Sequence, residues 1–249
     1  VLGTPLDVRR FMEGILTRVG GVVGRHPADR QHAIAVELSA VDPVIRDHLG
    51  MRDGSTIFNG AFDPQSPALK STACHHLVRT HHAVAGIAGL ALDHAIDPAL
   101  TPIVHRCGAI KTSMVSLRTT VLLVRLRYQC TTKKGFWENL QVAEECLTLA
   151  FRGPTTQPEW LPPDQVNALL AAKPEANTPP ELASTQVRRV VEGWPDLASH
   201  LATIAQDRAA VLLETNRRVR EAAGARARFE VQPHLPADLL ATFILLPVN

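Results

Sequence analysis

The amino-acid sequence predicts an α+β fold: a mainly antiparallel sheet packed with helices, plus a helical hairpin-like excursion before a final buried strand. Residues 107–151 contain several runs in which apolar and polar side chains alternate, as in half-buried strands. Residues 164–226 show helical spacing instead, and residues 239–248 are almost wholly apolar. Such an apolar strand must be buried in a sheet, and the nearest one is formed by residues 107–151. We therefore expect the helices between them to be an excursion from one domain.

Composition excludes several protein classes. The chain has 249 residues, of which 45% are hydrophobic and 20% charged, so a disordered chain is excluded. Its apolar stretches are too short to span a bilayer, and residues 1–5 resemble neither a signal peptide nor a transit peptide. Because the sequence starts at Val1, we expect a piece trimmed from a longer protein. Four cysteines without CxxC spacing favour reduced thiols and a cytoplasmic location: Cys74, Cys107, Cys130 and Cys146.

Residues 1–76 are predicted to form an N-terminal α/β portion. Thr4 is typical of a helix N-cap and Pro5 of the first helical turn, and Gly20-Gly21 ends that helix. The glycine-dense residues 20–24 are interpreted as a helix C-cap and loop. The remaining expected elements are a strand over 33–38, a short helix over 42–50, a strand over 55–62 and a loop over 63–73.

Residues 77–155 are predicted to form a helix followed by an antiparallel meander. Thr80 is the expected N-cap of this helix, and Asp97-Pro98 ends it. The expected strands cover residues 107–115, 119–131 and 140–151, with a turn at Lys133-Lys134-Gly135. In the middle strand, alternation places Leu122, Val124, Leu126 and Tyr128 on one face and Arg125 and Arg127 on the other.

Residues 156–226 are predicted to form the helical excursion. A proline-rich connector precedes expected helices over residues 164–173, 179–194 and 196–226. The last has a single apolar stripe, which calls for a partner helix, and the two preceding helices are the expected partners. Residues 227–249 then return to the sheet as strands.

Motifs for nucleotide or hydrolytic chemistry are missing from the sequence. It contains neither GxxxxGK[ST] nor GxGxxG nor GxSxG. Glu144 and Glu145 are adjacent on a strand, so they point to opposite faces and make a poor acid–base pair. The histidine cluster His75-His76 and His81-His82 leaves open a metal-binding or hydrolytic domain, although its spacing is not that of a zinc site. The sequence predicts no catalytic residue, no metal and no cofactor.

Basic residues form the remaining candidate site. The net charge is only +2, yet no Asp or Glu occurs between Pro98 and Trp137. These cations could meet phosphates or another anionic partner, or could be a solvated face; arginines near a helix C-terminus also favour the helix dipole. The candidate residues are Arg118, Arg125, Arg127, Lys133, Lys134, Arg217, Arg218 and Arg220.

Several stretches, taken in order, resemble the C-terminal region of bacterial Swi/Snf-type helicases, the RapA-like (HepA-like) ATPases and their relatives in phage defence. Residues 77–84 resemble the entry into a helix in those proteins, with His82 in place of the usual Pro. The other resembling stretches are an apolar-then-basic strand, a strand and its stop, and a closing helix and strand: residues 119–128, Glu144-Glu145 with 150–153, 216–223 and 231–240.

This resemblance implies a non-catalytic C-terminal accessory domain of a helicase-like, DNA-dependent ATPase. That family couples ATP hydrolysis to movement on duplex DNA, and some members remodel RNA polymerase. The implied partners are the motor domains of the parent protein, and duplex DNA or RNA polymerase; no membrane is implied. The motor motifs, including those for ATP, would lie outside this chain. A pure protein-docking scaffold, with the long helix as its arm, is the other alternative.

Overall fold

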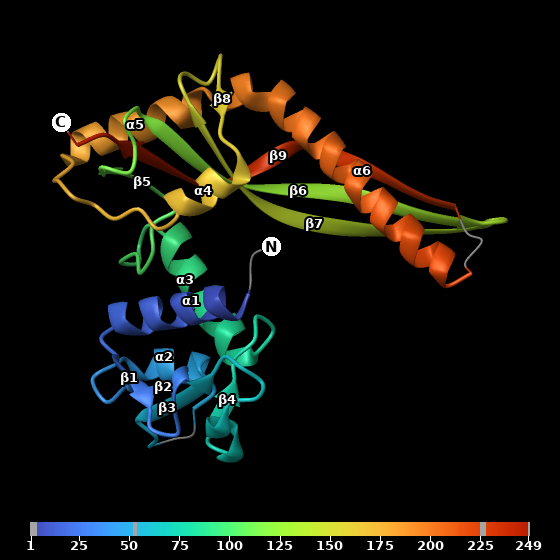
Figure 1. Cartoon of the computed structure of the whole chain (residues 1–249). Coiled ribbons are helices and arrows are strands. Elements are labelled where there is room, and N and C mark those ends of the chain that lie inside the picture. The colour runs from blue at the N-terminus through green and yellow to red at the C-terminus, as the bar shows by residue number, and fades with distance from the viewer. Residues whose placement is uncertain (1–3, 52–53, 225–227, 249) are drawn as a thin grey trace. The chain divides into compact units, whose positions relative to one another are not determined.

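The chain divides into two compact units, residues Val1–His105 (unit 1) and Arg106–Asn249 (unit 2). The computed structural model describes residues 4–51, 54–224 and 228–248 (Figure 1). Unit 1 contains one four-stranded sheet and unit 2 one five-stranded sheet, both mostly antiparallel and both packed with helices. The predicted α+β class is therefore confirmed.

Unit 1 packs helices against a sheet of order β1-β2-β3-β4. Strands β1 to β3 are antiparallel neighbours, and β4 runs parallel to β3. Two strands were missed: β1 overlaps the glycine-dense residues 20–24 that were interpreted as a loop, and β4 follows the predicted loop over 63–73, where no strand was expected. The elements are α1 (Pro5–Arg18), β1 (Val22–His26), β2 (Asp29–Glu37), α2 (Pro43–His48), β3 (Ile57–Ala61), the 3-10 helix η1 (Pro67–Lys70), β4 (Cys74–His76) and α3 (His82–Ile96).

The helices of unit 1 begin at side-chain caps. Thr4 caps α1, as the sequence predicts, and forms a capping box with Asp7. The predicted cap of α3 is wrong by one residue: His81, not Thr80, accepts the backbone N–H of Ala83 through its Nδ1 atom, at 3.2 Å. The imidazole nitrogen thus does what a Ser or Thr oxygen does at most caps.

Unit 2 is built on a sheet of order β5-β9-β6-β7-β8. The predicted hairpin is present, but the predicted meander is wrong. The last strand, β9, lies between β5 and β6, antiparallel to β6 and parallel to β5. The elements are β5 (Cys107–Lys111), β6 (Thr119–Lys134), β7 (Trp137–Arg152), β8 (Glu159–Trp160), α4 (Pro163–Leu169), α5 (Pro180–Glu192), η2 (Trp194–Leu197), α6 (Ala198–Ala222) and β9 (Arg228–Leu246).

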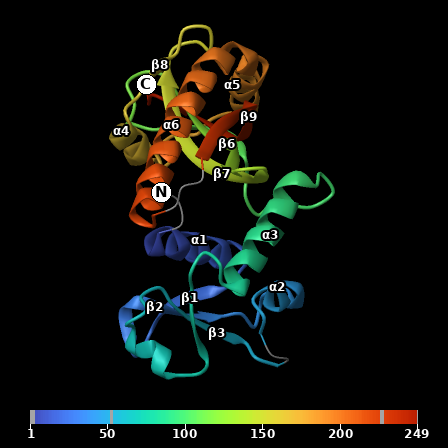
Figure 2. The same cartoon turned by 90° about the vertical axis from the view of Figure 1, so that its right-hand side faces the viewer.

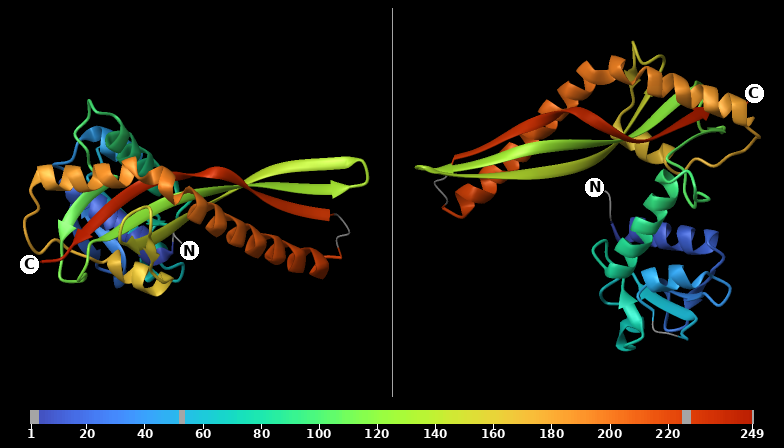
Figure 3. Two further views of the ribbon diagram at one scale, coloured as in Figure 1. Left: turned by 90° about the horizontal axis from the view of Figure 1, so that it is seen from above. Right: turned by 180° about the vertical axis from the view of Figure 1, so that it is seen from behind.

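Three long strands extend side by side from the base of this sheet, with α6 beside them (Figure 3). β6 and β7 pair over sixteen consecutive residues. We call the distal part of these strands the arm: residues 125–134 of β6, 137–146 of β7 and 228–238 of β9.

One face of the sheet in unit 2 is covered by α5 and α6 (Figure 2). The even-numbered residues of β6 lie on this face, and Leu122, Leu126 and Tyr128 are at most 2% exposed. The predicted partner of the long helix is wrong. Its apolar stripe, which includes Leu201 and Ala205, packs with the strands in one core rather than against two other helices. The opposite face is covered at its base by α4.

The two units divide the chain differently from the predicted boundaries at 76/77 and 155/156. The buried face of α3, including Val84, Ile87 and Leu90, belongs to the core of unit 1, so this helix does not join the strands that follow it. Residues 156–226 and 227–249 both belong to unit 2. Within the described part of the chain, no helix combines the length and the apolar character needed to cross a membrane.

Candidate functional site: the arm of unit 2

The arginines predicted as a basic stripe lie on the face of the arm opposite α6, where they are paired with carboxylates. Arg125 Nε donates to Asp238 Oδ2 at 3.0 Å, and Arg127 donates through a terminal nitrogen to Asp238 Oδ1 at 3.3 Å. Arg125 also lies 3.8 Å from a carboxylate oxygen of Glu144. The hydrogen bond to Asp238, and then the charge of Glu144, raise the pKa of Arg125. These two cations therefore have anionic partners before any ligand arrives.

The two lysines at the hairpin turn differ from each other. Lys133 Nζ lies 3.7 Å from Glu138 Oε1 and 3.5 Å from Glu230 Oε2. Lys134 is exposed, and among the described residues it has no ion pair. Lys134 is thus the predicted lysine with charge free for a partner.

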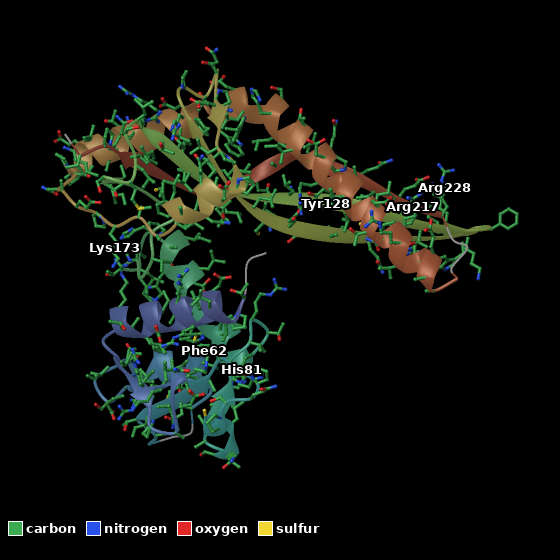
Figure 4. All side chains as sticks on the ribbon, viewed as in Figure 1. Phe62, His81, Tyr128, Lys173, Arg217 and Arg228 are labelled. Carbon is green, nitrogen blue, oxygen red and sulfur yellow. The ribbon has the colours of Figure 1, made fainter. Side chains whose placement is uncertain are left out.

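The arginines of α6 form contacts of their own. Figure 4 labels Arg217 near the C-terminal end of this helix. Arg217 and Arg218 both donate to Glu214, at 2.9 to 3.1 Å. Arg220 instead donates to Thr132 Oγ1 at 3.0 Å, and its guanidinium lies 4.7 Å from the ring centroid of Phe229. Arg220 thus tethers the end of the helix to β6 and β9.

Arg118 lies at the base of the sheet, away from the arm. Its Nε donates to Gln186 Oε1 at 2.8 Å, and a terminal nitrogen donates to the carbonyl of Gly153 at 3.4 Å. Partial burial, and then the charge of Arg189, lower the pKa of Arg118. The eight predicted cations therefore occupy several separate places and do not form one continuous basic surface.

An anchor in the middle of the arm joins α6 to β7. Glu145 accepts a hydrogen bond from Arg208 Nε at 3.1 Å, and a second, shorter one from a terminal nitrogen of Arg208. The buried Tyr128 hydroxyl donates to the same carboxylate at 3.3 Å, and burial raises the pKa of this phenol. Figure 4 labels Tyr128 on the arm beneath α6.

The end of the arm exposes large apolar side chains, which the sequence reasoning did not single out. Phe136 in the turn is fully exposed, Trp137 is 57% exposed, and Leu140 and Val142 are 55% and 66% exposed. Leu140 and Val142 share the face that carries Arg125 and Arg127. Their alternation with polar neighbours is visible in the sequence, but only the structure shows that, within the described part of unit 2, α4 covers the base of this face and no helix covers its distal end.

The outer edge of β7 is also open. β8 pairs only with Phe151 and Arg152, and the backbone N–H of Leu161 donates to the carbonyl of Ala150. From Trp137 to Leu149, no other strand in the described residues pairs with this edge. We call residues 137–149 of β7 the free edge.

The histidine cluster belongs to unit 1 and forms a packed group. The ring centroids of His81 and His82 are 4.3 Å apart, and those of His75 and His81 are 5.4 Å apart. Burial, and then neighbouring imidazoles, lower the pKa values of His75 and His81. The described residues contain no group of three or more His, Cys, Asp or Glu side chains placed to hold a metal ion. The geometry therefore favours packing and helix capping at these histidines.

Comparison with known families gives one match. A family model described as "Domain of unknown function (DUF8741)" matches residues 95–249, which is more than half of the chain and includes all of unit 2. A search of curated proteins gives no match.

Proposed function

Because the chain belongs to the family called Domain of unknown function (DUF8741), whose description assigns no activity, we propose a function from the geometry of the matched region. Unit 2 is a non-catalytic accessory module that docks onto another protein through its arm. The arm provides a long, stiff surface held by the α6 anchor.

One observation carries this proposal: the arm exposes apolar side chains, while its charged side chains other than Lys134 are paired internally. Phe136, Trp137, Leu140 and Val142 are each more than half exposed, within the same hairpin. Exposed apolar clusters of this kind mark protein interaction sites, and aromatic residues dominate the binding energy of many interfaces. By contrast, Arg125 and Arg127 already have Asp238 as a partner.

The resemblance described above supports a Swi/Snf-type ATPase as the parent protein. If the chain is the accessory region of a Swi/Snf-type ATPase, the docking partner is the motor region of the same protein, or RNA polymerase. ATP would then bind to the motor, outside this chain.

Direct contact with nucleic acid is the second candidate, favoured by the acid-free stretch before Trp137 and by the unpaired Lys134. It requires Arg125 and Arg127 to exchange Asp238 for phosphates, which offsets much of the gain from counterion release. A steep loss of DNA affinity with added salt, removed by Arg125→Glu with Arg127→Glu, would support this candidate over docking.

The test of the docking proposal uses the full chain and the purified motor region of the parent protein. Replacing Phe136 and Trp137 together with Ser should weaken binding about 30-fold, which corresponds to about 2 kcal/mol for two interface aromatics. Val191→Ser is the matched control, because Val191 on α5 is 53% exposed but lies off the arm. Equal affinities for the double variant and the control would refute docking through the arm.

A further inference from the structure

The arm has two lateral edges, and only one of them is protected against pairing with another strand. On the β9 side, β5 pairs only with residues 242–246, so the distal part of β9 is an edge as well. That part contains Pro233 and Pro236, and its register with β6 shifts twice. Prolines and register irregularities are the devices by which edge strands avoid edge-to-edge association.

The free edge of β7 has neither device. Residues 137–149 contain no proline, and their register with β6 is unbroken. Every second residue of an edge strand directs its N–H and C=O groups outward, so this edge presents a regular row of donors and acceptors. At about 3.4 Å per residue, the row is about 44 Å long.

We propose that a second copy of this chain pairs antiparallel with this edge, centred on Ala143, so that two five-stranded sheets become one. The inference goes beyond the proposed docking function, because it assigns the free edge of β7 to a second copy of the chain. A two-fold axis perpendicular to the sheet relates the copies, so α6 lies on the same face in both.

The length of the free edge selects the register. Pairing centred on Ala143 uses the whole edge, because Trp137 then lies opposite Leu149 of the second copy and Leu149 opposite its Trp137. Beyond Leu149 the edge is already paired, because the backbone carbonyl of Ala150 accepts a hydrogen bond from the N–H of Leu161. The hairpin turn of each copy therefore ends where β8 of the other begins.

The charges of the edge agree with this register. Val142 lies opposite Glu144 of the second copy, Gln141 opposite Glu145 and Glu138 opposite Thr148, so no two carboxylates face each other. Centring the pair on Gln141 instead would place Glu138 opposite Glu144 twice, which destabilises a sheet. Leu140 lies opposite Cys146, which covers an exposed leucine.

The register can be tested by a cross-link between copies. In Leu140→Cys, the new thiol faces the native, exposed Cys146 of the second copy, within the distance that a disulfide spans. In the same copy these positions are six residues apart on one strand, about 20 Å, so an intrachain bond is excluded. After mild oxidation of a mixture of isotope-labelled and unlabelled chains, we expect a covalent dimer. Its disulfide should join position 140 of a labelled chain to Cys146 of an unlabelled chain, and the reverse. Leu140→Cys with Cys146→Ser should lose this link, and failure to find it in the first variant overturns the proposal.

Two substitutions at Val142 give opposite expectations in sedimentation of the full chain. In Val142→Glu, the new carboxylate lies opposite Glu144 of the second copy, and the two-fold axis repeats this contact. We expect this repulsion to weaken dimerisation on the order of tenfold, whereas Val142→Lys should preserve or strengthen it. Val142 is mostly exposed, so both variants should fold. A chain that sediments at 27.1 kDa at its highest soluble concentration, or equal effects of the two variants, overturns self-pairing. If self-pairing is refuted in this way but Phe136 and Trp137 are still required for binding the motor region, the docking proposal is retained and only the pairing of two copies is rejected.

Discussion

Removing Arg208 tests how much the polar anchor between Arg208 and Glu145 contributes to holding α6 on the arm. In Arg208→Met the aliphatic stem is kept, while Glu145 loses both of its arginine hydrogen bonds. A hydrogen bond to a charged group contributes about 1.5–3 kcal/mol when buried. The Arg208 and Glu145 side chains are 42% and 30% exposed, so solvent screens the pair and the expected loss is smaller. We expect the free energy of unfolding of unit 2 to fall by about 1.5 kcal/mol.

Tryptophan fluorescence during urea unfolding measures this loss in unit 2 alone, because Trp137, Trp160 and Trp194 all lie there. Combining Arg208→Met with Glu145→Gln completes a double-mutant cycle, for which we expect a coupling of about 1 kcal/mol. Additivity of the two substitutions to within about 0.3 kcal/mol would show that the anchor contributes nothing, and that apolar packing and the Arg220 contacts hold α6 without it.

Three further predictions concern the two cores. In α3, a Cβ at Gly86 would lie 2.3 Å from the His48 carbonyl oxygen, whereas a Cβ at Gly89 would meet nothing within 4 Å. In circular dichroism melts, Gly86→Ala should therefore destabilise unit 1 by more than about 1 kcal/mol, and Gly89→Ala should stabilise it by up to about 1 kcal/mol. Equal effects of the two substitutions would contradict this reasoning. Burial lowers the pKa of His81 below its ordinary value of 6.5, so the unfolded chain binds this proton more readily than the folded chain. The contribution of neutral His81 to the free energy of unfolding should therefore be fully present above pH 6.5 and be lost as the pH falls through the lowered pKa. His81→Asn, which keeps an acceptor for the cap, should reduce this acid sensitivity in urea titrations followed by circular dichroism, and an unchanged pH dependence would exclude His81 as its source. On β9, Ile244→Ala should cost about 2–5 kcal/mol in fluorescence-monitored unfolding because Ile244 is fully buried, and Phe243→Ala clearly less because Phe243 is 39% exposed; the reverse order would contradict the assigned faces.

Local patterns predicted the strands of unit 2 well, and topology less well. Alternation placed Leu122 and Tyr128 on the buried face of β6 and Arg125 on the other, as found, because side chains alternate whatever lies beside the strand. The position of β9 was not predictable in this way. An apolar strand can be buried beside any open edge, and the preference for sequence neighbours favoured a meander.

The shorter strands and the pairing of the arginines lay beyond sequence reasoning for different reasons. β1 is mostly exposed and β4 has only three residues, two of them histidines, so neither shows a clear pattern. Arg125 looked available because no acid is near it in sequence, yet its partner Asp238 lies 113 residues away. The free edge became visible only when the neighbours of β7 were known.

The central place of β9 has a consequence for synthesis on the ribosome. The β6–β7 hairpin leaves the exit tunnel well before Arg228–Leu246 is made, and among the strands of the described residues β5 pairs only with β9. The nascent hairpin therefore has two open edges until the final strand inserts between β5 and β6. Long-range strand insertion of this kind is slow, and the waiting species is prone to aggregation. Chaperone dependence during translation should accordingly be greatest for unit 2, and shifting β9 ahead of β5 by circular permutation should relieve it.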